Sequence, residues 1–312
     1  MVQMLESLAC RASRAFQAQP VLKYAAAMYE PARRKRRPSS ENTLLERRLL
    51  LGALVCAVLF IIGFLLFVST TWGQQIDVDA YFGHKYLRPE VVKLDSYAID
   101  LVSDTSLLLA AMGLFVIAAV RRCAFVGVIT VAAFWCAVAG SVALKGLLPW
   151  RALVADDALL DRGLQAHNSY PSGHATIGTS LALSLLLILP SRWRPWLAVA
   201  AGCLSAEYAT SMVFTGWHRP SDSLGSLAWS GFCFSLAAAL AVRLRGQPSS
   251  AISHPSHAVL GSAVLAILGG VATWAFGTSL ANFLLLSGLI ISGAFALTAW
   301  YGWELRAVDW RG

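Results

Sequence analysis

Long apolar stretches recur along most of this chain, and they limit its fold more than any other feature. A helix needs about 20 apolar residues to cross the hydrocarbon core of a bilayer. Eight stretches come near this length, at residues 49–71, 103–120, 124–144, 174–190, 196–217, 221–242, 258–277 and 283–303. Only 13% of the residues are charged, about half the share of a soluble domain. We therefore expect an all-α integral membrane protein with about eight spans.

The fourth, fifth and sixth stretches contain Ser, Thr and Gly as well as Leu. Small and weakly polar residues allow membrane helices to approach closely and to hydrogen-bond to one another. These three stretches are therefore expected to form an inner bundle. We predict a segment at 1–48, a catalytic core at 49–245, and two further spans with a short tail at 246–312.

Lys and Arg predict the orientation, because short cytoplasmic loops carry an excess of them. With the N-terminus inside, 18 of the 25 fall in cytoplasmic segments. The expectation is an integral protein of the plasma membrane with a cytoplasmic N-terminus. This asymmetry explains the net charge of +8 without a nucleic-acid partner.

Two polar segments flank the first span. Residues 1–48 are amphipathic and then basic, and we expect them to contact anionic lipid. They do not resemble a cleavable signal sequence, because the apolar run starts late and is long enough to span. Residues 72–102 contain Asp77, Asp79 and Asp95 without a regular ligand spacing, so we expect an interfacial cap over the bundle rather than a cation site.

The first polar cluster with chemical potential follows the third span. Lys145 and Arg151 precede a turn, Tyr170–Pro171–Ser172–Gly173–His174, that leads directly into the fourth span. Backbone N–H groups that converge at a helix N-terminus bind anions. His174 is expected at the rim of such a site.

The second cluster joins the fifth and sixth spans and contains His218, Arg219, Pro220 and Asp222. Residues four apart meet across one helical turn, so the Asp222 carboxylate can reach the His218 imidazole. This contact would fix the tautomer and raise the basicity of the other ring nitrogen. His218 is therefore a candidate nucleophile.

The predicted topology brings both clusters to the same, extracytoplasmic side. Two histidines, one supported by a carboxylate, suit attack on phosphorus with proton donation to the leaving oxygen, while cationic groups hold the phosphate. We expect no metal and no cofactor. The expected partners are a phosphorylated lipid substrate and membrane lipids, and the sequence leaves the oligomeric state open.

These residues resemble the motifs of the PAP2 superfamily of type-2 phosphatidic acid phosphatases. Its second motif, Pro-Ser-Gly-His, is present at residues 171–174, and its third matches at Ser211, His218 and Asp222. The resemblance implies a six-helix core, to which two C-terminal spans are added. It also implies His218 as the phosphohistidine-forming nucleophile, Asp222 as its partner and His174 as the general acid. Lys145, Arg151, Ser172 and Gly173 would bind the phosphate.

The chain departs from the family pattern at two places. Five residues instead of six separate Lys145 from Arg151, with Ala152 in place of Pro, and Met212 replaces the Arg that follows Ser211. Arg219, which we count among the phosphate-binding residues, and Arg162 are candidates to supply the missing charge.

Three functions fit this pattern. The first is a lipid phosphatase or diphosphatase that uses water as acceptor. The second is a phosphotransferase in which an alcohol intercepts the phosphohistidine. The third is a degenerate member of the superfamily that binds lipid without turnover.

Overall fold

The computed structural model describes residues 40–149, 168–245, 247–248, 278–306 and 308–310. All of these residues belong to one compact unit. The predicted span 258–277, Arg151 and Arg162 lie outside the described residues.

The described unit is helical apart from one short pair of strands. Its helical elements, in chain order, are α3 (Ser40–Gly63), the π-helical η2 (Phe64–Val68), α4 (Thr71–Phe82), the 3₁₀ turn η3 (Gly83–Tyr86), α5 (Pro89–Asp100), α6 (Asp104–Val120), α7 (Ala124–Leu147), α9 (Gly173–Ile188), η4 (Ser191–Trp193), α10 (Arg194–Phe214), α11 (Pro220–Arg245) and α13 (Thr278–Leu305). The strands β1 (Gln247–Pro248) and β2 (Val308–Asp309) pair antiparallel.

Within the described residues, five segments are long and apolar enough to cross a membrane. They are Glu41–Val68, Ala124–Leu147, Ser191–Phe214, Pro220–Arg245 and Leu280–Leu305. Two further predicted spans correspond to the shorter apolar helices α6 and α9. The helical membrane fold is confirmed, whereas the count of eight spans stays a prediction.

The predicted start of the first span lies too far along the chain. We expected it at residue 49, but α3 begins at Ser40. The polar residues in between continue the helix beyond the apolar run and form ion pairs with other helices. Glu46 lies 3.6 Å from Arg243 of α11, and Arg48 lies 3.8 Å from Glu304 of α13. The apolar stretch therefore located the part of α3 that can contact lipid, but not the residue at which the helix begins.

Large apolar side chains cover the outer faces of α3 and α6. Leu51 and Leu54 are 60% and 59% exposed, and Val120 is 79% exposed. Soluble proteins rarely expose continuous apolar surface of this extent. These outer faces of α3 and α6 are therefore suited to contact with lipid.

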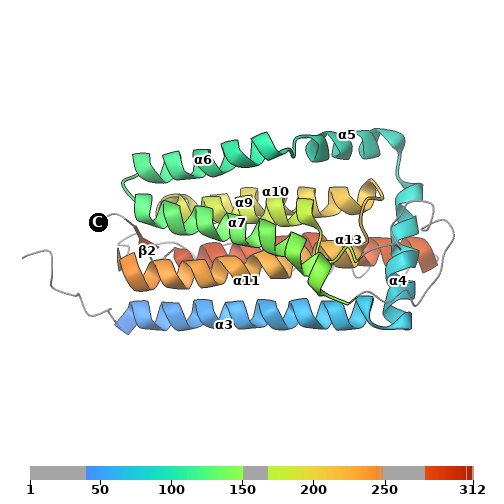
Figure 1. Cartoon of the computed structure of the whole chain (residues 1–312), viewed down its shortest axis with the longest axis horizontal. Helices are drawn as coiled ribbons and strands as arrows, with labels where there is room; N and C mark the ends of the chain where they lie inside the picture. Colours follow the sequence, from blue (N-terminus) through green and yellow to red (C-terminus); the bar gives the residue numbers. More distant parts are fainter. Residues whose placement is uncertain (1–39, 150–167, 246, 249–277, 307, 311–312) are drawn as a thin grey trace, which may run out of the picture. The chain divides into compact units, whose positions relative to one another are not determined.

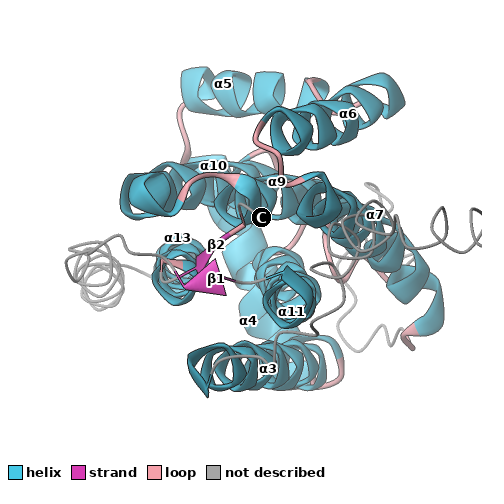
Figure 2. Cartoon of the chain, turned by 90° about the vertical axis from the view of Figure 1, so that its left-hand side faces the viewer, coloured by secondary structure: helices cyan, strands magenta, loops and turns pink. Residues whose placement is uncertain are grey.

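The interior of the bundle is formed by α9, α10 and α11, which pack on one another and on α7 and α13. The end-on view in Figure 2 shows α9 and α10 between α3 on one side and α5 and α6 on the other. Hydrogen bonds between hydroxyls join these helices: Thr179 to Ser205 at 2.9 Å, and Ser180 to Ser230 at 3.3 Å. This arrangement agrees with the inner bundle that the small residues predicted.

The two ends of the bundle differ. At one end α4 crosses the ends of the long helices and packs on α13 and α11 (Figure 1). At the other end β1 and β2 pair, and the buried Arg194 of α10 donates to the carbonyls of Leu186, Leu305 and Val308. The end that carries α4 also carries both histidine clusters.

Candidate active site

The loop before α9 is held against α3 by Tyr170. This side chain is buried, its hydroxyl donates to the Phe60 carbonyl at 2.7 Å, and its ring contacts that of Phe60 at a centroid distance of 5.0 Å. Its own N–H donates to the Asn168 side chain at 3.1 Å, and the Tyr170–Pro171 peptide bond is cis. The loop therefore enters α9 in a defined position.

Ser172 is the N-cap of α9, and its hydroxyl accepts from the N–H of Ala175 at 3.5 Å. Gly173 and His174 occupy the first two helical positions. Their N–H groups have no acceptor within the helix, because the first turn offers none. With the positive end of the helix dipole, these groups can bind an anion. Ser172 itself mainly caps the helix.

The second loop reverses the chain between α10 and α11. The N–H groups of Trp217 and His218 both donate to the Met212 carbonyl, at 3.0 and 2.9 Å. The turn needs a left-handed residue, and Gly216, with φ of 68°, supplies it. Pro220 then begins α11, where its missing N–H costs nothing.

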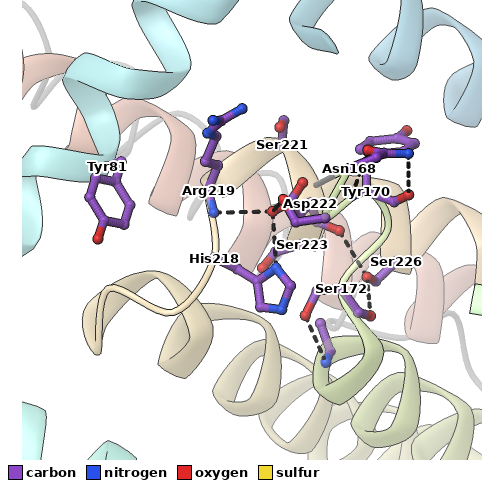
Figure 3. A network of polar contacts seen from close by, with 12 residues as sticks. Tyr81, Asn168, Tyr170, Ser172, His218, Arg219, Ser221, Asp222, Ser223 and Ser226 are labelled. Atoms are coloured by element: carbon purple, nitrogen blue, oxygen red, sulfur yellow. Dashed lines mark hydrogen bonds and ion pairs between the residues drawn. The ribbon is translucent and has the colours of Figure 1, made fainter. Parts of the chain in front are cut away.

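Asp222 organises the candidate nucleophile. Its Oδ2 accepts from His218 Nδ1 at 3.0 Å, from the Ser169 hydroxyl at 2.7 Å and from the Arg219 N–H at 3.2 Å (Figure 3). The side chain of Asp222 is 3% exposed and that of His218 is 12% exposed. With Nδ1–H donating to the carboxylate, Nε2 carries the lone pair. The predicted contact is therefore present, although His218 lies in the turn before α11 and not in the helix itself.

Hydrogen bonds join the two loops, although they are far apart in sequence. The N–H of Ser172 donates to the Asp222 carbonyl at 3.0 Å, and the Ser226 hydroxyl donates to the Ser172 carbonyl at 2.7 Å. The ring of His174 meets that of Trp217 edge-on at 5.8 Å. The structure thus brings the two histidines to one place.

Lys145, at the last turn of α7, completes this group. Its Nζ lies 3.7 Å from the point where a Cβ on Gly173 would stand. It also interacts electrostatically with Asp222 and His174. A positive charge therefore stands beside the free N–H groups of α9, where a phosphate oxygen would bind.

The side chains of Arg219 and Met212 are both buried. Arg219 is 5% exposed, and its side chain extends away from the His218 ring (Figure 3). It interacts electrostatically with Asp222 and with Asp77 of α4. Met212 is fully buried in an apolar cluster with Ala175, Leu227 and others. The role of Arg219 in phosphate binding stays a prediction.

Sequence reasoning missed the role of α4. Asp77 is 1% exposed, and its carboxylate accepts from the N–H of Ser221 at 2.9 Å and from the Ser221 hydroxyl at 2.5 Å. Burial, reinforced by the nearby negative charge of Asp222, raises the pKa of Asp77 to about 7. The sequence showed that Asp77 lies in a polar segment. It gave no sign that Asp77 contacts Ser221, which lies 144 residues further along the chain.

The described residues contain no cluster of possible metal ligands. No group of three or more His, Cys, Asp or Glu side chains gathers there with a geometry for a metal ion. The charged groups around His218 are instead suited to an anion.

The structure thus defines a helical membrane protein in which His174 and His218 lie at one site beside Lys145. Residues 125–246 match the model of the PAP2 superfamily, and the resemblance read from the motifs is thereby confirmed. Comparison with curated proteins and with solved structures gave no match. Because the superfamily consists largely of phosphatases, this similarity suggests a phosphatase-type function at a membrane.

Proposed function

We propose that this protein is a membrane lipid phosphatase or diphosphatase that acts through a phosphohistidine on His218. The observation that carries the proposal is the bond from His218 Nδ1 to Asp222, which leaves Nε2 free to attack. The active site faces the extracytoplasmic side, and the membrane is the plasma membrane. The charge asymmetry of the sequence supports this orientation.

In the first step, Nε2 of His218 forms a bond to phosphorus while the bond from phosphorus to the lipid oxygen breaks. His174 gives its proton to that oxygen, so the lipid alcohol, or the lipid monophosphate from a diphosphate, leaves neutral at that atom. Lys145 and the N–H groups of Gly173 and His174 hold the non-bridging oxygens. Asp222 stabilises the positive imidazole that forms.

In the second step, water attacks the phosphohistidine. His174, now neutral, accepts a proton from the water as the phosphorus–nitrogen bond breaks, and inorganic phosphate is released. An alcohol in place of water would give phosphate transfer with the same residues. Arg151 belongs to the proposed phosphate site, although it lies outside the described residues.

A large apolar cavity supports a lipid as the substrate. Its volume is about 740 Å³, and it lies between α3, α11 and α13. It reaches Tyr170 and Ser221 at the active-site end, and Arg48 and Glu304 at the other end. Ser221 directly precedes Asp222, so a hydrocarbon chain in this cavity would lie beside the site. We place the hydrocarbon part of the substrate there.

Acid-quench trapping of labelled phosphate tests the mechanism. Wild-type protein and His174→Ala, given a nitrophenyl phosphate, should yield an acid-labile, alkali-stable phosphoenzyme, because this leaving group needs little proton donation. His218→Ala should trap nothing and release no phosphate from phosphatidic acid or a polyprenyl diphosphate. A phosphoenzyme on His218→Ala would refute the assignment, and a wild-type protein that neither traps nor turns over would favour a binding protein.

A further inference from the structure

Two buried side chains of α4 hold the catalytic loop from outside the segment that matches the superfamily. Asp77 and Tyr81 are four residues apart and therefore lie on the same face of α4. The Tyr81 hydroxyl donates to the Gly216 carbonyl at 3.0 Å, and Asp77 accepts both bonds from Ser221. Each side chain is 1% exposed.

These bonds fix the backbone on both sides of His218. Gly216 precedes it by two residues, and Ser221 follows it by three. Ser221 belongs to the first turn of α11, where an unpaired N–H would otherwise face a buried environment at a cost. Because the same turn carries Asp222, a shift of Ser221 would move the carboxylate that aims the imidazole.

We propose that α4 positions the nucleophile, with Asp77 and Tyr81 acting as positioning residues through Ser221 and Gly216. This inference rests on the proposed role of His218. Neither side chain touches the reacting atoms, so their contribution lies in geometry. A misplacement of about 1 Å in a reacting group costs up to roughly a hundredfold in rate.

Kinetics can distinguish a residue that positions the nucleophile from a residue that only stabilises the fold. Lys145 and the N–H groups of α9, which hold phosphate in our proposal, make none of the bonds to α4 described above. Loss of the α4 contacts should therefore lower the rate of phosphoenzyme formation and leave KM nearly unchanged. A variant that only unfolds part of the protein would instead lower activity in proportion to the folded fraction.

The test uses the full-length protein in detergent, with single-turnover phosphorylation by a nitrophenyl phosphate. Asp77→Ala and Tyr81→Phe should slow phosphoenzyme formation by between about tenfold and a hundredfold. Asp77→Asn should recover most of the rate, because its amide oxygen still accepts from the Ser221 N–H. Asp79→Asn is the matched control on α4, since Asp79 pairs with Gln75 at the exposed face.

Thermal unfolding and active-site titration correct each rate for the amount of folded protein. Tyr81→Phe removes one hydroxyl and keeps the ring, so it serves as the decisive variant if Asp77→Ala fails to fold. Corrected rates equal to wild type in Tyr81→Phe would overturn the proposal. If His218→Ala also kept full activity, the proposed nucleophile itself would be wrong, and the two failures are thus distinguishable.

Discussion

The N–H of Ser172 donates a 3.0 Å hydrogen bond to the carbonyl of Asp222. This single bond joins the turn before α9 to the first turn of α11, and so fixes the helix N-terminus that would bind phosphate relative to the imidazole that would attack it. Each loop therefore supports the other.

Asp222→Asn should retain the fold and lose most of the chemistry. The amide cannot stabilise the positive imidazole as a carboxylate does, and it can present the wrong atom to Nδ1. We expect phosphoenzyme formation to slow by about a hundredfold or more, as when a neutral amide replaces the supporting carboxylate of other histidine sites. Single-turnover trapping measures this, with Asp79→Asn as control, and an unchanged rate would remove Asp222 from the mechanism.

Met212→Arg should destabilise the protein instead of restoring the family charge. The side chain of Met212 is 0% exposed and lies in an apolar cluster with Ala209 and Phe283. A guanidinium there would be buried without a partner, which costs several kcal/mol. Met212→Leu, which conserves volume, should cost less than about 1.5 kcal/mol. Thermal unfolding in detergent compares the two, and a folded Met212→Arg with faster hydrolysis would contradict this view.

Asp77 should make stability depend on pH in a defined direction. Its pKa is raised to about 7 in the folded protein, against about 3.9 in an unfolded chain. Between these values the folded state binds more protons, so the contribution of Asp77 to stability is complete below about pH 4 and is lost as the pH rises through about 7. The stability of wild type relative to Asp77→Asn should therefore fall from pH 5 to pH 8, by at most about 1.4 kcal/mol per pH unit. A difference that stays constant over this range would show that Asp77 is ionised throughout.

A bulky side chain in the apolar cavity should discriminate between substrates by their hydrocarbon part. Ala296 of α13 lines the cavity, and Ala296→Trp would narrow it. We expect KM for a long-chain lipid phosphate to rise about tenfold, equivalent to about 1.4 kcal/mol of binding, while the kinetics with a nitrophenyl phosphate stay unchanged. Leu289→Trp, at an exposed position of the same helix, is the control. Equal effects of both variants would place the chain elsewhere.

The orientation can be measured at the two ends of the bundle. Tyr86 is 65% exposed at the end that carries α4, and Arg192 is exposed at the opposite end. In a cysteine-free background, Tyr86→Cys should react with an impermeant thiol reagent added outside intact cells. Arg192→Cys should react only after the membrane is opened. Reaction of both in intact cells would refute the proposed topology.

Local patterns predicted the contact between His218 and Asp222. The structure makes this contact in another way than the helical spacing suggested, because His218 lies in the turn before α11 and Asp222 lies in the first turn of that helix. Apolar runs likewise located the apolar helices among the described residues, though not α4 and α5, because hydropathy reports directly which segments lipid can surround.

Contacts between distant segments were beyond such patterns. The sequence contains no sign that Asp77 binds Ser221 or that Tyr81 reaches Gly216, because nothing periodic relates residues more than 130 positions apart. The directions of Arg219 and Met212 were equally hidden, since they depend on how α10 and α11 rotate against α4 and α13. The sequence alone therefore could not predict which cationic side chain lies at the proposed phosphate site.

The bond from Tyr170 to the Phe60 carbonyl has a consequence for chimeras between this chain and proteins of the PAP2 superfamily. Phe60 lies ahead of residues 125–246, as Asp77 and Tyr81 do, whereas Lys145, His174, His218 and Asp222 all lie within them. A cassette exchanged at those boundaries would transfer the four proposed active-site residues without Phe60, Asp77 and Tyr81, which contact the two loops in this chain. Recombination points placed before α3 would keep the donor and the acceptor of each of these hydrogen bonds in the same parental sequence.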